Sequence, residues 1–271
     1  MSPRSLAVCI WSAVVVALVV SACNRVPYTN RRNLVLIGWN SELQLGADAY
    51  EEIVRQEKTV TSGKNARVLA RVGEQLRRRT PSQFRSLDWE FRLLESDAVN
   101  AFALPGGKVA VYEGILPVLA NEGGMSAVVG HEIGHAVARH GAERISGTML
   151  LQLGLSIADI GLSNSEMHDQ LMGLLGLGAT VGAVLPFSRA NELEADYLGA
   201  VFMAKAGYDP KESARVWRRM NKKYGDNPLE FLSTHPSNSK RIARLEEEMG
   251  TFRKYYKRAR TKRGTGSALE R

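Results

Sequence analysis

The amino-acid sequence predicts a mainly helical α+β fold in which a small β-sheet directly precedes a central helix. Apolar residues recur at helical spacing along most of the chain after residue 40, whereas two short segments near residues 90 and 110 alternate as strands do. The 271 residues and the apolar content of 44% are enough for one large domain with a core. We therefore expect a signal peptide at 1–22, a tether at 23–40, one domain at 41–250 and a basic tail at 251–271.

The first 22 residues have the layout of an export signal, because Arg4 is followed by an apolar run over residues 6–20. The run ends in Val20-Ser21-Ala22-Cys23, which resembles the lipobox of bacterial lipoproteins. We expect acylation of Cys23 and a lipid-anchored location at the periplasmic face of an outer membrane. The alternatives are ordinary signal cleavage, which leaves a soluble periplasmic protein, and an uncut anchor in the inner membrane.

The net charge of +8 first suggests a polyanionic partner, but the charge is concentrated at one end of the chain. Residues 251–271 contain eight bases and one acid, and once Arg4 is also set aside the body from 23 to 250 is neutral. We therefore expect no nucleic-acid binding. The basic segment is interpreted as a solvated, disordered tail, with contact to anionic lipid or lipopolysaccharide as the alternative.

Two amphipathic helices are expected before the sheet. The first begins at a cap formed by Ser41 with Gln44, and the second spans about 65–79 and stops before Pro81. Strands are expected at 88–94 and 108–112, with a turn at Pro105-Gly106-Gly107.

The central helix is expected from about Gly124 to Arg144. The glycine-rich apolar stretches at 147–162 and 171–187 are interpreted as core helices, with a membrane-facing hairpin as the alternative. Later helices are expected at three places: about 189–206, after Asp209-Pro210, and from 237 to Gly250.

The central helix carries the motif His131-Glu132-Ile133-Gly134-His135. Residues four apart project from the same helix face about one turn apart, so both imidazoles can reach one Zn²⁺ ion. Glu132 lies about 100° round the helix from His131 and can act as general base on a water beside the ion. A third histidine six residues after His135 is missing, because that position is Gly141.

A third ligand is predicted on the helix expected at 189–206. Glu192 and Asp196 are four residues apart and share a face, whereas Glu194 is turned about 200° away. We expect Glu192 to bind the single zinc ion and Asp196 to fix the tautomer of a ligand histidine. Glu194 is expected to face elsewhere, and a solvated acidic face is the alternative for the whole segment.

Four motifs occur in order between residues 40 and 250: Asn100–Gly107, Val129–Glu143, Ser188–Asp196, and Thr234–Ser237 with Arg241-Ile242. Through them the chain resembles the HtpX-like and CAAX prenyl protease type I family of zinc metallopeptidases, especially its periplasmic lipoprotein branch of BepA-, LoiP- and YcaL-like proteins. The resemblance implies a zincin-like fold and endoproteolysis. It also implies that the substrates are misfolded, damaged or misassembled cell-envelope proteins.

The resemblance further suggests that His235 faces the metal, where it either takes the open coordination position or steadies the oxyanion. An exposed or capping histidine is the alternative. Arg241 either stabilises the same loop or simply lies on the last helix, and His140 rotates off the metal face and is left unassigned. Substrate is expected to add to a strand edge through four residues: Asn100, Ala101, Phe102 and Ala103.

Two other functions compete with an active endopeptidase. One is a substrate-binding or chaperone module with little or regulated proteolysis. The other is an exopeptidase or small-amide hydrolase, which needs a group that holds a substrate terminus, and the sequence shows no motif for one. The sequence gives no indication of the oligomeric state.

Overall fold

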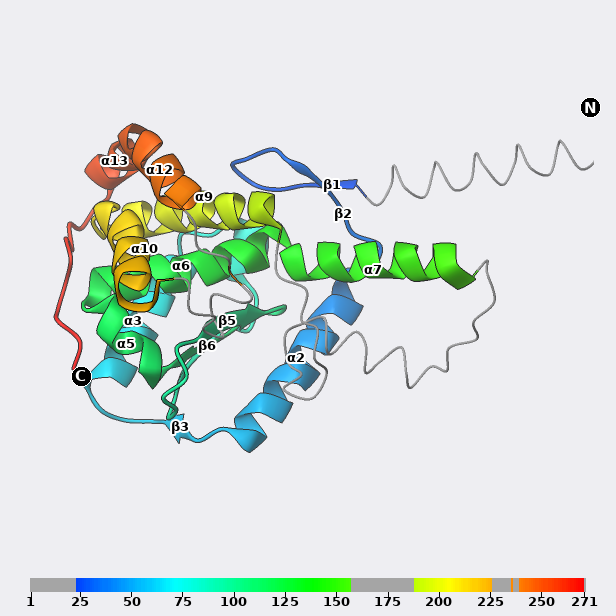
Figure 1. Cartoon of the computed structure of the whole chain (residues 1–271), viewed down its shortest axis with the longest axis horizontal. Helices are drawn as coiled ribbons and strands as arrows, with labels where there is room; N and C mark the ends of the chain where they lie inside the picture. Colours follow the sequence, from blue (N-terminus) through cyan, green and yellow to red (C-terminus); the bar gives the residue numbers. More distant parts are fainter. Residues whose placement is uncertain (1–22, 157–187, 226–234, 236–238, 271) are drawn as a thin grey trace, which may run out of the picture.

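The computed structural model describes residues 23–156, 188–225, 235 and 239–270. Most of these residues are helical, and the helices surround a small sheet (Figure 1). The predicted mainly helical α+β class is therefore confirmed. The helices other than a short 3₁₀ turn at Glu113–Ile115 are α2 (Trp39–Gln56), α3 (Lys64–Arg77), α4 (Ser82–Arg85), α5 (Leu116–Leu119), α6 (Glu122–Ala138), α7 (His140–Ser156), α9 (Arg189–Ala206), α10 (Lys211–Tyr224), α12 (Ser239–Glu247) and α13 (Met249–Arg258).

The sheet has four strands in the order β3-β4-β6-β5. β6 (Lys108–Tyr112) is parallel to β4 (Glu90–Leu94) and antiparallel to β5 (Ala101–Leu104), while β3 (Thr59–Val60) covers the other side of β4. The predicted turn therefore joins β5 to β6, and the two strands expected from alternation lie side by side in parallel. β5 is the last strand of this sheet, so its outer edge faces away from β6.

α6 lies at the centre of the molecule, between α9 and the sheet (Figure 1). Nearly all of its residues are buried, which suits a helix with little polar surface. α6 and α9 cross so closely that a Cβ atom added to Gly199 would lie 2.6 Å from the backbone nitrogen of His131. This approach brings one face of each helix into direct contact.

The central helix is shorter than predicted. It ends at Ala138, because Arg139 adopts a left-handed conformation with φ 57° and ψ 37°. The Arg139 guanidinium donates from Nε to Glu42 at 2.8 Å, which ties the break to α2. α7 begins at the next residue, so His140 projects in a direction that a continuous helix would not give it.

The segment from 23 to 40 is not the loose tether that the sequence predicts. β1 (Cys23–Arg25) pairs antiparallel with β2 (Arg32–Leu34), and Val26 and Val35 are buried. Asn33 donates from its amide to the carbonyl of Ala138 at 2.7 Å, so the hairpin packs on the end of α6. α2 then begins at Trp39 with Gly38 as its cap, so Ser41 lies inside the helix.

The expectation of a disordered basic tail is also wrong. α13 continues past Gly250 to Arg258, and the extended residues after it pack along the body through bridges at 264 and 268. The carbonyls of Thr265 and Ser267 accept hydrogen bonds of 2.7 and 2.8 Å from the first two amides of α6. Composition alone is misleading here, because two apolar residues between the bases, Phe252 and Leu269, are buried.

Parts of the glycine-rich region fall outside the structure. Residues 147–156 continue α7, whereas 157–162 and the second stretch at 171–187 lie outside the described residues. Among the helices that are described, none combines the length and the apolar character needed to span a membrane.

Candidate active site

The three predicted metal ligands meet where α6 crosses α9. His131 and His135 project from α6, and Glu192 projects from the first turn of α9. The Nε2 atoms of the two histidines are 3.1 Å apart. The Glu192 carboxylate lies 3.4 Å from His131 Nε2 and 3.3 Å from His135 Nε2. The structure thus brings together the three expected metal ligands, and all three are at most 3% exposed.

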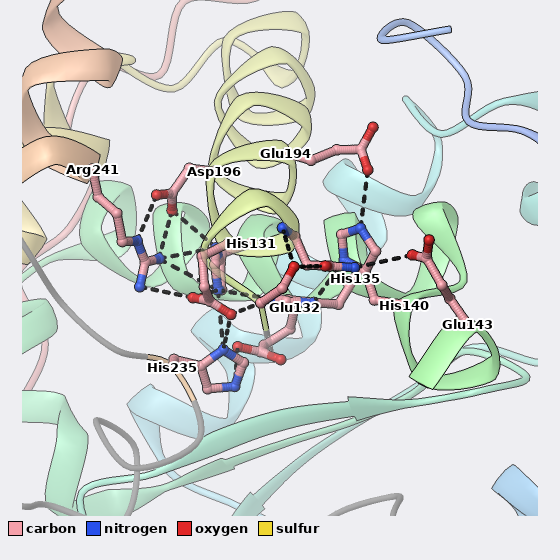
Figure 2. Close-up of polar contacts among 12 residues, drawn as sticks. His131, Glu132, His135, His140, Glu143, Glu194, Asp196, His235 and Arg241 are labelled. Atoms are coloured by element: carbon pink, nitrogen blue, oxygen red, sulfur yellow. Dashed lines mark hydrogen bonds and ion pairs between the residues drawn. The ribbon is translucent and has the colours of Figure 1, made fainter. Parts of the chain in front are cut away.

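His235 reaches the same point from a separate part of the chain (Figure 2). Its Nδ1 atom is 3.3 Å from His131 Nε2 and 3.2 Å from Glu192 Oε1. The side chain is 3% exposed, so the alternative of a solvent-exposed histidine is excluded. One ligand atom from each of these four residues lies within 4.8 Å of the others.

The spacing and chemistry of this group fit a divalent ion. Ligands placed tetrahedrally at about 2.0–2.1 Å from zinc are separated from one another by about 3.3 Å. The contacts given above range from 3.1 to 3.4 Å. Two imidazole Nε2 atoms that face each other at such a distance need a proton or a cation between their lone pairs. Imidazole and carboxylate donors together are a common zinc set.

Asp196 and Arg241 hold the first histidine and Glu192 in place. Asp196 Oδ1 accepts from His131 Nδ1 at 2.9 Å, which leaves Nε2 of that ring for a metal. Arg241, on α12, donates to Asp196 at 2.7 and 2.8 Å and lies 2.8 Å from Glu192. Its guanidinium also stacks 3.9 Å from the ring centre of Trp217. Arg241 is thus part of the site and does not simply lie on the last helix.

The same contacts shift the protonation of His131. Burial by itself lowers the pKa of this imidazole, but the charge and hydrogen bond of Asp196 outweigh burial and raise the pKa to about 9. Burial acts on Asp196 in the opposite sense, and Arg241 outweighs it and keeps the pKa of the carboxyl below its usual value. Asp196 is therefore ionised and able to accept the His131 proton.

Glu132 lies beside the ligands rather than among them. It is 2% exposed, and its Oε1 atom has no hydrogen-bond partner among the described residues. His235 Nε2 lies 3.7 Å from that atom. Burial raises the pKa of the Glu132 carboxyl, which makes it a better proton acceptor.

The structure adds two residues that sequence reasoning missed, His140 and Glu194 (Figure 2). His140 Nδ1 lies 2.9 Å from His135 Nδ1, and His140 Nε2 lies 3.0 Å from Glu194 Oε2. Glu194 lies beyond His140, and because the break at Arg139 turns His140 between Glu194 and His135, Glu194 is linked to the site through that ring. Burial lowers the pKa of His140, so its ring is neutral.

The expected substrate edge divides into two pairs of residues. Asn100 and Ala101 are buried, and the Asn100 side chain accepts from the Ala101 amide at 2.8 Å, so these two stabilise the sheet. Phe102 and Ala103 are half-buried. Ala103 lines a pocket that also includes His135, so this end of β5 lies near one of the candidate ligands.

Known proteins that are similar to this chain are peptidases, as a metal site of this kind suggests. The model of Peptidase family M48 matches residues 63–249. The mitochondrial metalloendopeptidase OMA1 of Schizosaccharomyces pombe is 37% identical over 233 residues, which cover 82% of this chain and 65% of the relative. The OMA1 of Saccharomyces cerevisiae is 30% identical over 256 residues, which cover 87% and 72%. The beta-barrel assembly-enhancing protease of Escherichia coli (strain K12) is 29% identical over 162 residues, which cover 57% and 33%.

These relatives contradict the location expected from the N-terminal sequence. The two with the higher identity and coverage are mitochondrial by name, so a lipid-anchored protein of an outer membrane is not supported. The lipoprotein branch of the family is not supported either, because the bacterial relative matches over a smaller part of both chains. The chain spans less than two thirds of the S. pombe protein. The family match over most of the sequence, and the identity across 72% of the S. cerevisiae relative, show that the chain belongs to Peptidase family M48.

Proposed function

We propose that this chain is a zinc-dependent endopeptidase that hydrolyses internal peptide bonds of misfolded or damaged envelope proteins. The observation that carries the proposal is the meeting of His131, His135 and Glu192, with the buried Glu132 carboxylate beside them, whose Oε1 atom has no hydrogen bond within the described part of the chain. The relatives support it, because their names describe metalloendopeptidases and a protease that enhances β-barrel assembly.

Each polar side chain of the site then has a task. Zinc, when bound, supplies a Lewis acid that polarises the scissile carbonyl and lowers the pKa of a water molecule. Glu132 accepts the proton of the attacking water and delivers it to the leaving amine. Asp196 orients His131, and Arg241 pairs with both Asp196 and Glu192 and keeps the two carboxylates aligned.

His235 completes a four-donor set in the described arrangement. Of the two roles considered for it, this position favours the resting ligand, because Nδ1 faces both His131 and Glu192. If His235 held the ion in this way, it would have to move aside before a substrate carbonyl could reach the same position. The edge of β5 supplies backbone groups to which an extended chain can pair, and such pairing gives affinity with little side-chain selectivity.

The test is metal content together with casein cleavage by the purified full chain, with and without a chelator. We expect one zinc per chain, cleavage at internal bonds, and loss of cleavage when zinc is removed. The matched variant is Glu132→Gln, which should keep the zinc and lose cleavage. A chain that holds zinc, binds unfolded casein and leaves it intact would instead support the binding-module alternative.

A further inference from the structure

We infer that His140 is a positioning residue that fixes the ring of His135, and that the N-terminal hairpin holds this arrangement through Glu194. The inference rests on the proposed function, since His135 must act as a metal ligand. It concerns residues outside the ligand set, on the opposite side of His135 from Asp196 and Arg241 (Figure 2).

The direction of the hydrogen bonds follows from the ligand role. His135 Nε2 faces Glu192 and His131, so the proton of this ring must lie on Nδ1. His140 Nδ1 accepts it at 2.9 Å, and the His140 proton then lies on Nε2. That nitrogen donates to Glu194 Oε2 at 3.0 Å. The result is a relay that ends on a carboxylate, one residue longer than the direct contact of Asp196 with His131.

Glu194 is itself held by the hairpin between β1 and β2. Its carboxylate accepts from the hydroxyl of Thr29 and, at 2.5 Å, from Nε of Arg31. The two terminal nitrogens of Arg31 donate to Glu143 on α7 at 2.7 and 2.8 Å, and Glu143 accepts from Asn191 on α9 at 3.1 Å. Arg31 thus ties the hairpin to the two helices that carry His140 and Glu194.

Because the relay is buried, its hydrogen bonds can hold the ring of His135 in one orientation. His140 is fully buried and Glu194 is 7% exposed, so water cannot readily replace either hydrogen bond. Partners of this kind orient ligand histidines and raise their basicity, and removing them typically lowers metal affinity about 10–100-fold. A purely structural ion-pair cluster would lower the stability of the fold and leave metal affinity unchanged.

The experiment compares His140→Leu with His140→Asn in the full chain. Zinc affinity is measured by competition with a chromophoric chelator, and the absorption spectrum of bound Co²⁺ reports the ligand geometry. We expect His140→Leu to weaken zinc binding about 10–100-fold and to alter the Co²⁺ spectrum. Asparagine places an oxygen near the position of the imidazole Nδ1, so His140→Asn should bind zinc several-fold more tightly than His140→Leu.

The control is Tyr208→Phe, which removes a buried hydrogen bond of 2.7 Å to Glu122 at the other end of α6. It should lower the unfolding temperature and leave zinc affinity and the Co²⁺ spectrum unchanged. If His140→Leu does not fold, Arg31→Gln is the test of the relay, because the Arg31 side chain is partly exposed and its replacement is tolerated more easily. Arg31→Gln should bind zinc more weakly than Tyr208→Phe does.

Unchanged zinc affinity in His140→Leu, or equal losses in the leucine and asparagine variants, would overturn the relay while the parent chain still binds zinc. A zinc affinity of Arg31→Gln equal to that of Tyr208→Phe would also overturn the relay. A parent chain that binds no zinc would instead remove the proposed function, and the relay with it.

Discussion

The close crossing of α6 and α9 makes Gly199→Ala the most informative single substitution. The added Cβ atom would lie 2.6 Å from the nitrogen of His131 and 2.7 Å from the carbonyl carbon of Gly130, and ordinary contact begins at 3.4 Å. Both atoms belong to the backbone of α6, so the helices must separate by about 0.8 Å. A ligand constellation tolerates only about 0.5 Å of displacement. The substitution should therefore move Glu192 away from the two histidines.

Stability and function should respond differently to Gly199→Ala. Overpacking costs about 1–3 kcal/mol, and the better helix propensity of alanine offsets about 1 kcal/mol of it. A misplacement of about 1 Å can cost about 100-fold in catalysis. We therefore expect a loss of at most about 2 kcal/mol in the free energy of unfolding, but a fall of about 100-fold in kcat/KM for casein, with weakened zinc binding.

The assay pairs a zinc competition titration with thermal unfolding and casein cleavage. The control is Gly250→Ala in α13, where an added Cβ meets no described atom within 4 Å. This control should bind zinc and cleave casein as the parent does, with unchanged or slightly higher stability. Parent-like zinc affinity and cleavage in Gly199→Ala would show that this helix contact does not set the ligand geometry.

Three further changes test other parts of the structure. Glu132→Gln should lower casein kcat about 10²–10⁴-fold while the zinc content stays at one per chain, and loss of the zinc would show that Glu132 is a ligand. Burial raises the pKa of Glu122, but its hydrogen bonds, of which that from Arg71 is the largest, outweigh burial and lower the pKa. The pair of Arg71 and Glu122 therefore stabilises the fold at neutral pH, and this stabilisation is lost as the pH falls through the lowered pKa. Arg71→Gln should therefore reduce the drop in unfolding temperature on acidification, and an unchanged drop would contradict the assignment. Deleting residues 259–271 exposes the core around Leu269 and leaves two α6 amides without their partners, so it should cost about 2 kcal/mol or more by chemical denaturation, whereas a disordered tail predicts no change.

The ligand pairs could be predicted because they depend on local helix geometry. A spacing of four residues fixes which side chains share a face, and this holds for His131 with His135 and for Glu192 with Asp196. The meeting of the two helices does not follow from spacing. It depends on the close approach at Gly199, which becomes visible only when both helices are placed.

The place of His140 and Glu194 beside the site could not be predicted either, because it also depends on a long-range contact. The left-handed residue Arg139 is held by a contact with Glu42, almost a hundred residues earlier in the sequence, and no local pattern indicates that contact. A continuous helix would have turned His140 away from the metal face. The hairpin at 23–35 was missed because its polar composition resembles a linker, although Arg31 and Asn33 form specific long-range hydrogen bonds.

The eight bases at the C-terminal end predicted a solvated tail. The segment packs against the body instead, because Phe252 and Leu269 are buried. The predicted location was wrong because it depended on the short motif ending at Cys23. Such a motif spans few positions, whereas the mitochondrial relatives match across more than 80% of the chain.

The most direct test is a crystal structure of the zinc-loaded chain with anomalous diffraction recorded at the zinc absorption edge. We expect one anomalous peak, about 2.0–2.2 Å from nitrogen atoms of His131 and His135 and from an oxygen of Glu192. A zinc ion bound elsewhere, or a Glu192 carboxylate outside bonding distance of the peak, would show that these three side chains do not form the metal site.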